Sequence, residues 1–135
     1  MIQVELSKII IDEKRQDQII VLKEKKSDRQ FPIVIGILEA SSIKMKLAGI
    51  TPPRPMTHDL LLSVIEGLDA TVVSLVIDDM QNNTFHGKLN LLTHDGVEKT
   101  IDCRPSDGIA LAVRCGALIY VDEAVIEKAA IFKKK

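Results

Sequence analysis

Two blocks of apolar, β-branched segments, one within residues 2–36 and one within residues 70–103, constrain the fold of this chain more than any other feature. Each block holds three such segments separated by short polar turns, which is the pattern of an antiparallel meander. The strands are predicted at residues 2–11, 19–25, 31–36, 70–80, 85–93 and 97–103, with Pro32 beginning its strand because proline cannot pair within one.

Helical patterns follow each block. Leu38, Ala40, Ile43 and Leu47 fall on one helical face, and Gly49 suits the left-handed conformation that ends a helix. The remaining elements are predicted as helices at residues 58–67, 107–115 and 122–130 and a short strand at residues 118–121.

The predicted fold class is α+β, with two antiparallel β-meanders, helices inserted after each, and a single compact domain. The domain is expected to span residues 1–130, followed by a basic C-terminal tail at residues 131–135. A length of 135 residues suits one domain.

The composition is that of an ordinary globular protein, with 46% hydrophobic residues, 27% charged residues and a net charge of −1. No apolar run approaches the ~18–20 residues that cross a bilayer, and acidic residues interrupt the N-terminal segment. We therefore expect a cytoplasmic protein without membrane contacts. Aromatic residues make up only 3% of the chain, so any contact with nucleic acid should be mainly electrostatic.

Two turns concentrate the polar chemistry: "PPRPMTHDLL" at residues 52–61 and "DCRPSDGIAL" at residues 102–111. In each, an Arg-Pro pair precedes a helical pattern. Thr57 and Ser106 are predicted N-caps, and Asp59 and Asp107 fall in first helical turns, where free amides favour a carboxylate.

Arg54 and Arg104 are not explained by capping, because a helix N-terminus disfavours a cation. One hypothesis is that both turns bind an anion in a shared cleft, since arginine and free helix amides both suit phosphate. The alternative is that the arginines form structural ion pairs with nearby acids, namely Asp102, Asp107 or Glu39.

The acidic residues of this region could also serve a metal ion. Mg²⁺ in proteins takes one or two carboxylates and keeps several waters. His58 offers a base, although His58 and Asp59 are adjacent on a helix and cannot form a catalytic dyad. A packed histidine without a catalytic role is the alternative.

The segments "FPIVIGILEASSI", "PPRPMTHDLL" and "DCRPSDGIALAVRCGALIYV" resemble the bifunctional nuclease domain family, over nearly the whole chain to about residue 130. The resemblance implies an α+β fold and action on DNA and RNA. The positions that match the family's motifs are Glu39, Arg54, Pro55, His58, Asp59, Asp102, Arg104, Pro105, Ser106 and Asp107. Cys103 and Gly108 stand where the family often has alanine, and Gly108 lowers helix propensity by up to ~1 kcal/mol.

The resulting prediction is a metal-assisted nuclease of low sequence specificity. His58, Asp59 and Asp107 are its predicted catalytic residues, and Arg54 and Arg104 its phosphate-binding residues. Mg²⁺ or another divalent cation would be held by Asp102, Asp107 and Glu39. The alternative is a non-catalytic anion- or ligand-binding or oligomeric interaction module, and a homo-oligomer is expected in either case.

Overall fold

The computed structural model describes residues 1–12, 14, 17–82 and 84–129; the predicted tail lies outside this part of the chain. The strands are β1 (Ile2–Ile10), β2 (Asp17–Glu24), β3 (Gln30–Gly36), β4 (Ala70–Gln81), β5 (Thr84–Thr93), β6 (Glu98–Cys103) and β7 (Leu118–Val121). The helices are α1 (Ile37–Leu47), α2 (Thr57–Gly67), α3 (Pro105–Cys115) and α4 (Glu123–Ala129).

Both predicted meanders are present, and the α+β fold class is confirmed. They belong to one seven-stranded sheet in the order β3-β2-β1-β7-β4-β5-β6. The short strand β7 joins them, since it pairs antiparallel with β1 and parallel with β4. The sequence predicted β7 as a strand but did not predict this joining position.

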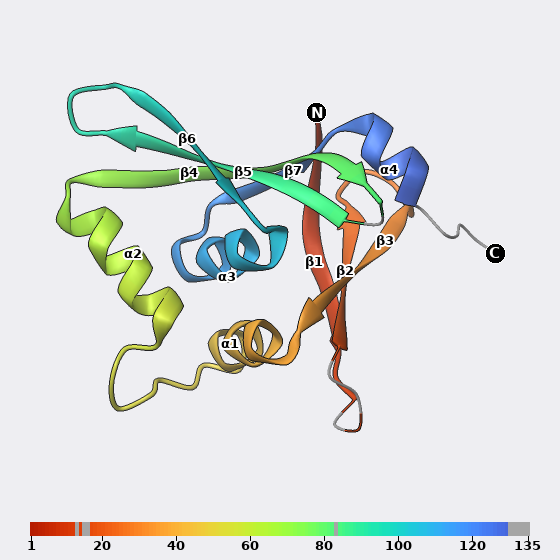
Figure 1. Cartoon of the computed structure of the whole chain (residues 1–135), viewed down its shortest axis with the longest axis horizontal. Coiled ribbons are helices and arrows are strands. Elements are labelled where there is room, and N and C mark those ends of the chain that lie inside the picture. The colour runs from red at the N-terminus through yellow and green to blue at the C-terminus, as the bar shows by residue number, and fades with distance from the viewer. Residues whose placement is uncertain (13, 15–16, 83, 130–135) are drawn as a thin grey trace.

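The sheet curls, so that β1–β3 stand at a steep angle to β4–β6 and the hollow side holds α3 (Figure 1). Register shifts occur in β1 at Leu6/Lys8 and in β4 at Val72/Ser74 and Ile77/Asp79. Such bulges bend a strand and increase its twist, which favours the curl. The hollow is filled by a core that includes Leu75, Ile77 and Ile109, all 0% exposed.

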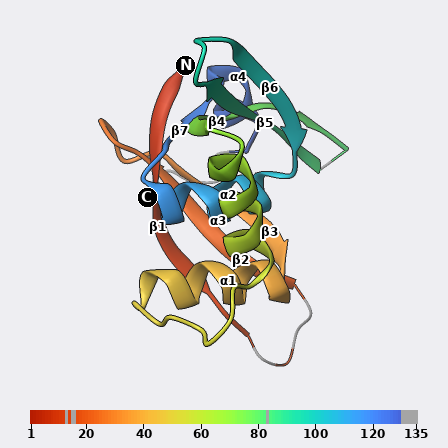
Figure 2. The ribbon, with the colours of Figure 1, turned by 90° about the vertical axis from the view of Figure 1, so that its left-hand side faces the viewer.

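Helix α3 is the central helix of the domain, and most of its residues between Pro105 and Ala112 are buried. In the view turned by 90°, α2 lies in front of α3 and α1 lies below both (Figure 2). A second, smaller core of Ile65, Val72, Leu89 and Leu111 lies where α2, α3 and the sheet meet. None of the helices in the described part of the chain is long and apolar enough to span a membrane.

The helix ends were predicted better than the helix starts. Gly49, the residue after the C-cap Ala48 of α1, and Gly116, the C-cap residue of α3, have positive φ angles of 74° and 76°, as expected. The N-cap predictions were wrong: Met56 and Arg104 are the extended residues, so Thr57 and Pro105 already belong to the helices. Proline is favoured at the first helical position because its fixed φ suits the helix and no amide is left unpaired.

Two further details differ from expectation. Leu38 and Leu47 are exposed, whereas Ala40 and Ile43 are fully buried, because α1 contacts the rest of the domain along a narrower face than predicted. Pro32 lies inside β3 rather than at its start. The strand tolerates it because β3 is at the edge of the sheet, where a missing donor need not break a ladder.

Candidate functional site

The two proline-containing turns meet in the structure. His58 in α2 and Asp107 in α3 are 49 residues apart in sequence, and His58 Nε2 lies 2.9 Å from Asp107 Oδ1. His58 is buried, and the Asp107 side chain is 30% exposed. The imidazole therefore approaches the carboxylate from inside the protein, and part of the carboxylate remains open to solvent.

Arg104 holds the other oxygen of the same carboxylate. Its Nε and Nη2 atoms donate to Asp107 Oδ2 at 3.1 and 3.0 Å. Nη2 also lies 2.9 Å from Glu39 Oε2. These partners, Asp107 first, raise the pKa of Arg104 above its ordinary value. Arg104 thus forms the structural ion pairs of the alternative hypothesis, although its side chain stays 69% exposed.

Two residues that the sequence analysis missed continue the network on the buried side of His58. Ser42 Oγ in α1 lies 2.8 Å from His58 Nδ1, and Arg114 Nη2 in α3 donates to Ser42 Oγ at 2.9 Å. Arg114 Nε donates to Asp59 Oδ1 at 2.8 Å, and the Arg114 side chain is only 6% exposed. We call this set the polar network; its members in order are Asp59, Arg114, Ser42, His58, Asp107, Arg104 and Glu39.

The direction of each hydrogen bond in the polar network follows from its donors. A guanidinium can only donate, so Ser42 Oγ accepts from Arg114, and a carboxylate can only accept, so His58 Nε2 donates to Asp107. In a neutral His58 with its proton on Nε2, Nδ1 is an acceptor and receives the Ser42 O–H. The bonding pattern therefore assigns the Nε2–H tautomer.

Ser42, His58 and Asp107 have the residue types of a serine-nucleophile triad, but the geometry differs from one that could act. Ser42 is 3% exposed and accepts a hydrogen bond from a buried guanidinium. A nucleophile must reach its substrate, and this hydroxyl cannot. The arrangement connects α1, α2 and α3 without presenting a nucleophile.

Asp59 faces a different partner from its neighbour His58, as adjacent helical positions require. The hydrogen bond from Arg114, together with that from the Met56 amide, lowers the pKa of Asp59 below its ordinary value. The Met56 amide lies 2.9 Å from Asp59 Oδ2, so Asp59 also satisfies a donor at the start of α2.

Two of the predicted site residues lie apart from the polar network. Arg54 is exposed in the loop before α2 and forms no ion pair with any residue that the structure describes. The Asp102 side chain is 80% exposed and pairs with Lys88 at 3.5 Å. The structure therefore brings together His58, Asp107, Arg104 and Glu39, reaches Asp59 through Arg114, and leaves out Arg54 and Asp102.

The carboxylates predicted to hold a divalent cation do not form a ligand set in this arrangement. Glu39 and Asp107 are joined through Arg104, and Asp102 is turned to Lys88. Within residues 1–12, 14, 17–82 and 84–129, no three His, Cys, Asp or Glu side chains are placed to hold a metal ion. The role of these three residues as metal ligands stays a prediction.

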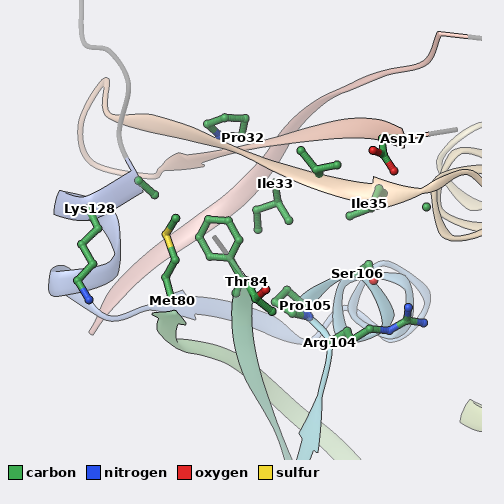
Figure 3. A pocket seen from close by; sticks show the side chains of 14 residues that line it. Asp17, Pro32, Ile33, Ile35, Met80, Thr84, Arg104, Pro105, Ser106 and Lys128 are labelled. Carbon is green, nitrogen blue, oxygen red and sulfur yellow. The ribbon is translucent and has the colours of Figure 1, made fainter. Parts of the chain in front are cut away.

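Arg104 also borders a cavity, which we call the β3–α3 pocket. It has a volume of about 590 Å³ and lies between β3, the adjoining ends of β4 and β5, α4 and the N-terminus of α3 (Figure 3). Arg104, Pro105 and Ser106 of the second turn line it. No lining residue of this pocket comes from the Arg54 turn in the described chain, so the two turns meet without sharing this pocket.

Ser42 and Arg114 carried weak signals in the sequence. Arg114 is a cation in the last turn of a helix, where attraction to the helix dipole is a sufficient explanation by itself. Ser42 lies beside a second serine on a helix with a mixed pattern, and only its burial distinguishes it. A single arginine directly after the apolar run at residues 109–113 could have suggested a buried ion pair.

Comparison with known proteins places these residues in a family. The family model described as the bifunctional nuclease domain matches residues 20–134. An uncharacterised protein of Mycobacterium tuberculosis is 36% identical over 123 residues, covering 91% of this chain and 73% of that protein. Bifunctional nuclease 1 of Oryza sativa subsp. japonica is 30% identical over 109 residues, which are 78% of this chain and 33% of the rice protein. With a family model that spans most of its length, this chain belongs to the bifunctional nuclease domain family.

Proposed function

We propose that this protein hydrolyses phosphodiester bonds in DNA and RNA with low sequence specificity. One observation supports the proposal above all: His58 and Arg104 both form hydrogen bonds with the partly exposed Asp107 carboxylate. Membership of the family and the likeness to the rice protein named bifunctional nuclease 1 support the substrate class.

In this proposal Arg104 binds the phosphate. Its exposed guanidinium has donors beyond those given to Asp107, and guanidinium groups suit phosphate geometry. Glu39 and Asp107 compete with phosphate for the same group, so substrate binding requires Arg104 to shift from Glu39. Arg54, exposed and without an ion pair among the described residues, adds a second contact to the sugar–phosphate backbone.

Asp107 is the proposed general base, which takes a proton from the attacking water molecule. It is partly exposed, and the His58 N–H and the Arg104 guanidinium fix the orientation of its two oxygens. His58 is too buried to meet substrate and acts through Asp107 as a positioning residue. Asp59 supports the same side chains from the far side of the polar network through Arg114. No step of this proposal passes through a metal ion, because the described carboxylates do not form a ligand set.

The test is cleavage of labelled single- and double-stranded DNA and RNA by the purified protein, in Mg²⁺, Mn²⁺ or EDTA. Asp107→Asn should reduce the rate at least about 100-fold, since general-base catalysis typically contributes a factor of 10² to 10⁴. Arg104→Gln should mainly raise KM.

The matched control is Lys99→Gln, which removes an exposed cation at the far end of β6. Equal cleavage by the wild type, Asp107→Asn and Lys99→Gln would identify a contaminating nuclease and contradict the proposal. Full activity in EDTA would show that the predicted divalent cation is not needed.

A further inference from the structure

The β3–α3 pocket has the dimensions and lining of a small-molecule site. Its volume of about 590 Å³ falls inside the range of roughly 300–1,000 Å³ that ligand pockets occupy. Apolar side chains from separate elements form its interior: Ile33, Ile35, Met80, Phe85 and Pro105. Ile33 and Met80 extend into the pocket from opposite walls, β3 on one side and the end of β4 on the other (Figure 3).

The two walls of this pocket differ in exposure. Ile33 and Ile35 on β3 are 3% and 5% exposed, whereas Met80 and Phe85 are only partly buried, so most of the apolar surface still open to a ligand belongs to Met80 and Phe85. Phe85 packs against Phe31 with ring centroids 5.9 Å apart, which holds its ring in place. An apolar molecule between these walls would remove the remaining apolar surface from water at about 25 cal/mol per Å².

Charge divides the pocket into two unlike ends. Lys128 lies at the α4 end, and Arg104 and Asp17 lie at the opposite end (Figure 3). The charge of Arg104 is already compensated by Glu39 and Asp107, and Asp17 adds another negative charge there. Lys128 forms no ion pair with the part of the chain that the structure describes, although its charge contributes, after the hydrogen bonds from Gln81 and the Met80 amide, to the lowered pKa of Asp79. A single negative group is therefore favoured at Lys128 and disfavoured at the far end.

We propose that the β3–α3 pocket binds a small monoanionic amphipathic molecule. Its aromatic or aliphatic body lies between β3 and the ends of β4 and β5, and its anionic group pairs with Lys128. The far end of the ligand is uncharged, because a second anion would face Asp17. This binding does not depend on nuclease activity, and it is measured without any nucleic acid.

Two fluorescent probes of nearly equal shape test the proposal. 8-Anilinonaphthalene-1-sulfonate carries one sulfonate, and N-phenyl-1-naphthylamine is the same ring system without it. Both should bind the wild type at one saturable site. Lys128→Gln should lower the affinity for the sulfonate probe roughly two- to fivefold, the range of a solvent-accessible ion pair, and leave the affinity for the neutral probe unchanged. Lys44→Gln, an exposed lysine on α1, is the matched control and should change neither.

A second pair of variants distinguishes this pocket from other apolar surface. Thr84→Trp places an indole at the pocket wall and should abolish the binding of both probes. Leu60→Lys with Val64→Lys changes the exposed apolar side of α2 and should leave binding intact. Binding that survives Thr84→Trp but is lost in the α2 variant would overturn the proposal. The proposal would also be overturned if Lys128→Gln and the wild type bound the sulfonate probe with equal affinity.

Amide chemical shifts of the wild-type protein give an independent reading if Thr84→Trp fails to fold. Titration with the sulfonate probe should shift the amides of Ile33, Ile35 and Ser106, which come from two separate elements around the pocket. Shifts confined to α2, or absent from these three residues at saturation, would show that the probe binds elsewhere.

Discussion

At Gly108 the absence of a side chain decides how closely α3 approaches the sheet. A Cβ at this position would lie 2.5 Å from Leu75 Cδ1 and 3.1 Å from Leu75 Cγ. Leu75 is 0% exposed and also lies against Gly87, so it has little room to move. From the sequence, Gly108 looked like a modest loss of helix propensity; in the structure it is a packing requirement.

We therefore predict that Gly108→Ala destabilises the protein. The overpacking should cost about 1–3 kcal/mol, more than the gain of up to ~1 kcal/mol in helix propensity. Urea unfolding followed by circular dichroism measures the difference. Gly67→Ala is the matched control, because no atom lies within 4 Å of its added Cβ, and it should be neutral or slightly stabilising. Equal stability of Gly108→Ala and wild type would show that β4 can shift away from α3.

At the scale of elements, both polar and apolar contacts attach α2 to the domain. His58 and Ile65 are the buried residues of α2, and His58 is bonded to both α1 and α3. Asp59 adds an ion pair with Arg114 of α3. The acidity of Asp59 should therefore influence the stability of the whole arrangement.

We predict that the protein loses stability at low pH, because Asp59 becomes protonated there. Its folded-state pKa lies below the ordinary 3.8, so its ion pair stabilises the fold fully above that pH and is lost as pH falls through the folded pKa. Asp59→Asn should lower the free energy of unfolding by roughly 1–2 kcal/mol at pH 7, in the range of a partly exposed hydrogen bond to a charged group. The difference from wild type should shrink below pH 3.8.

Urea unfolding of Asp59→Asn and wild type at pH 7 and pH 3 measures the difference in their free energies of unfolding at each pH. Glu98→Gln, an exposed acid on β6, is the charge control and should show no such convergence. A difference between Asp59→Asn and wild type that stays constant with pH would mean that the Arg114 contact does not depend on the Asp59 charge.

At the scale of the whole molecule, the outer side of α2 and the residue that follows it expose a group of large apolar side chains. Leu60 is 58% and Val64 48% exposed, and Leu68, the C-cap residue directly after α2, is 74% exposed. In the turned view this helix lies on the outside of the domain, in front of α3 (Figure 2). Apolar side chains gathered on one helix mark a surface suited to association.

We predict that the expected homo-oligomer forms through this side of α2. Leu68→Lys with Val64→Lys should shift the protein to monomers, weakening association by at least about tenfold, since buried apolar anchors dominate interface energy. Light scattering coupled to size exclusion measures the mass over a range of concentrations. Val97→Lys, on the exposed turn between β5 and β6, is the control. An oligomer that persists in the α2 variant must use another surface.

Much of the fold could be predicted because its signals are local. The strands of both meanders, all four helices and the glycine-terminated ends of α1 and α3 were recognised from alternation, helical spacing and turn residues. The starts of α2 and α3 were predicted one and two residues late; in α3 the reason is that Pro105 occupies the first helical position, before the predicted hydroxyl cap. The family could also be recognised, because its motifs are short and continuous.

The candidate site was predicted only in part. His58, Arg104, Asp107 and Glu39 do meet, and Arg104 pairs with Glu39 and Asp107, while its role in binding phosphate stays a prediction. Ser42 and Arg114 were missed because their partners lie 16 and 55 residues away in sequence. Arg54 and Asp102 share motifs with the others but not their location.

The sequence by itself determined the secondary structure, the fold class and the family, because periodicity and turn chemistry act over a few neighbouring residues. Only the tertiary structure decided that β7 joins two meanders, that the sheet curls around α3 and that a buried serine and arginine complete the polar network. These features depend on contacts between distant segments, and no local pattern specifies which distant residue a polar side chain will meet.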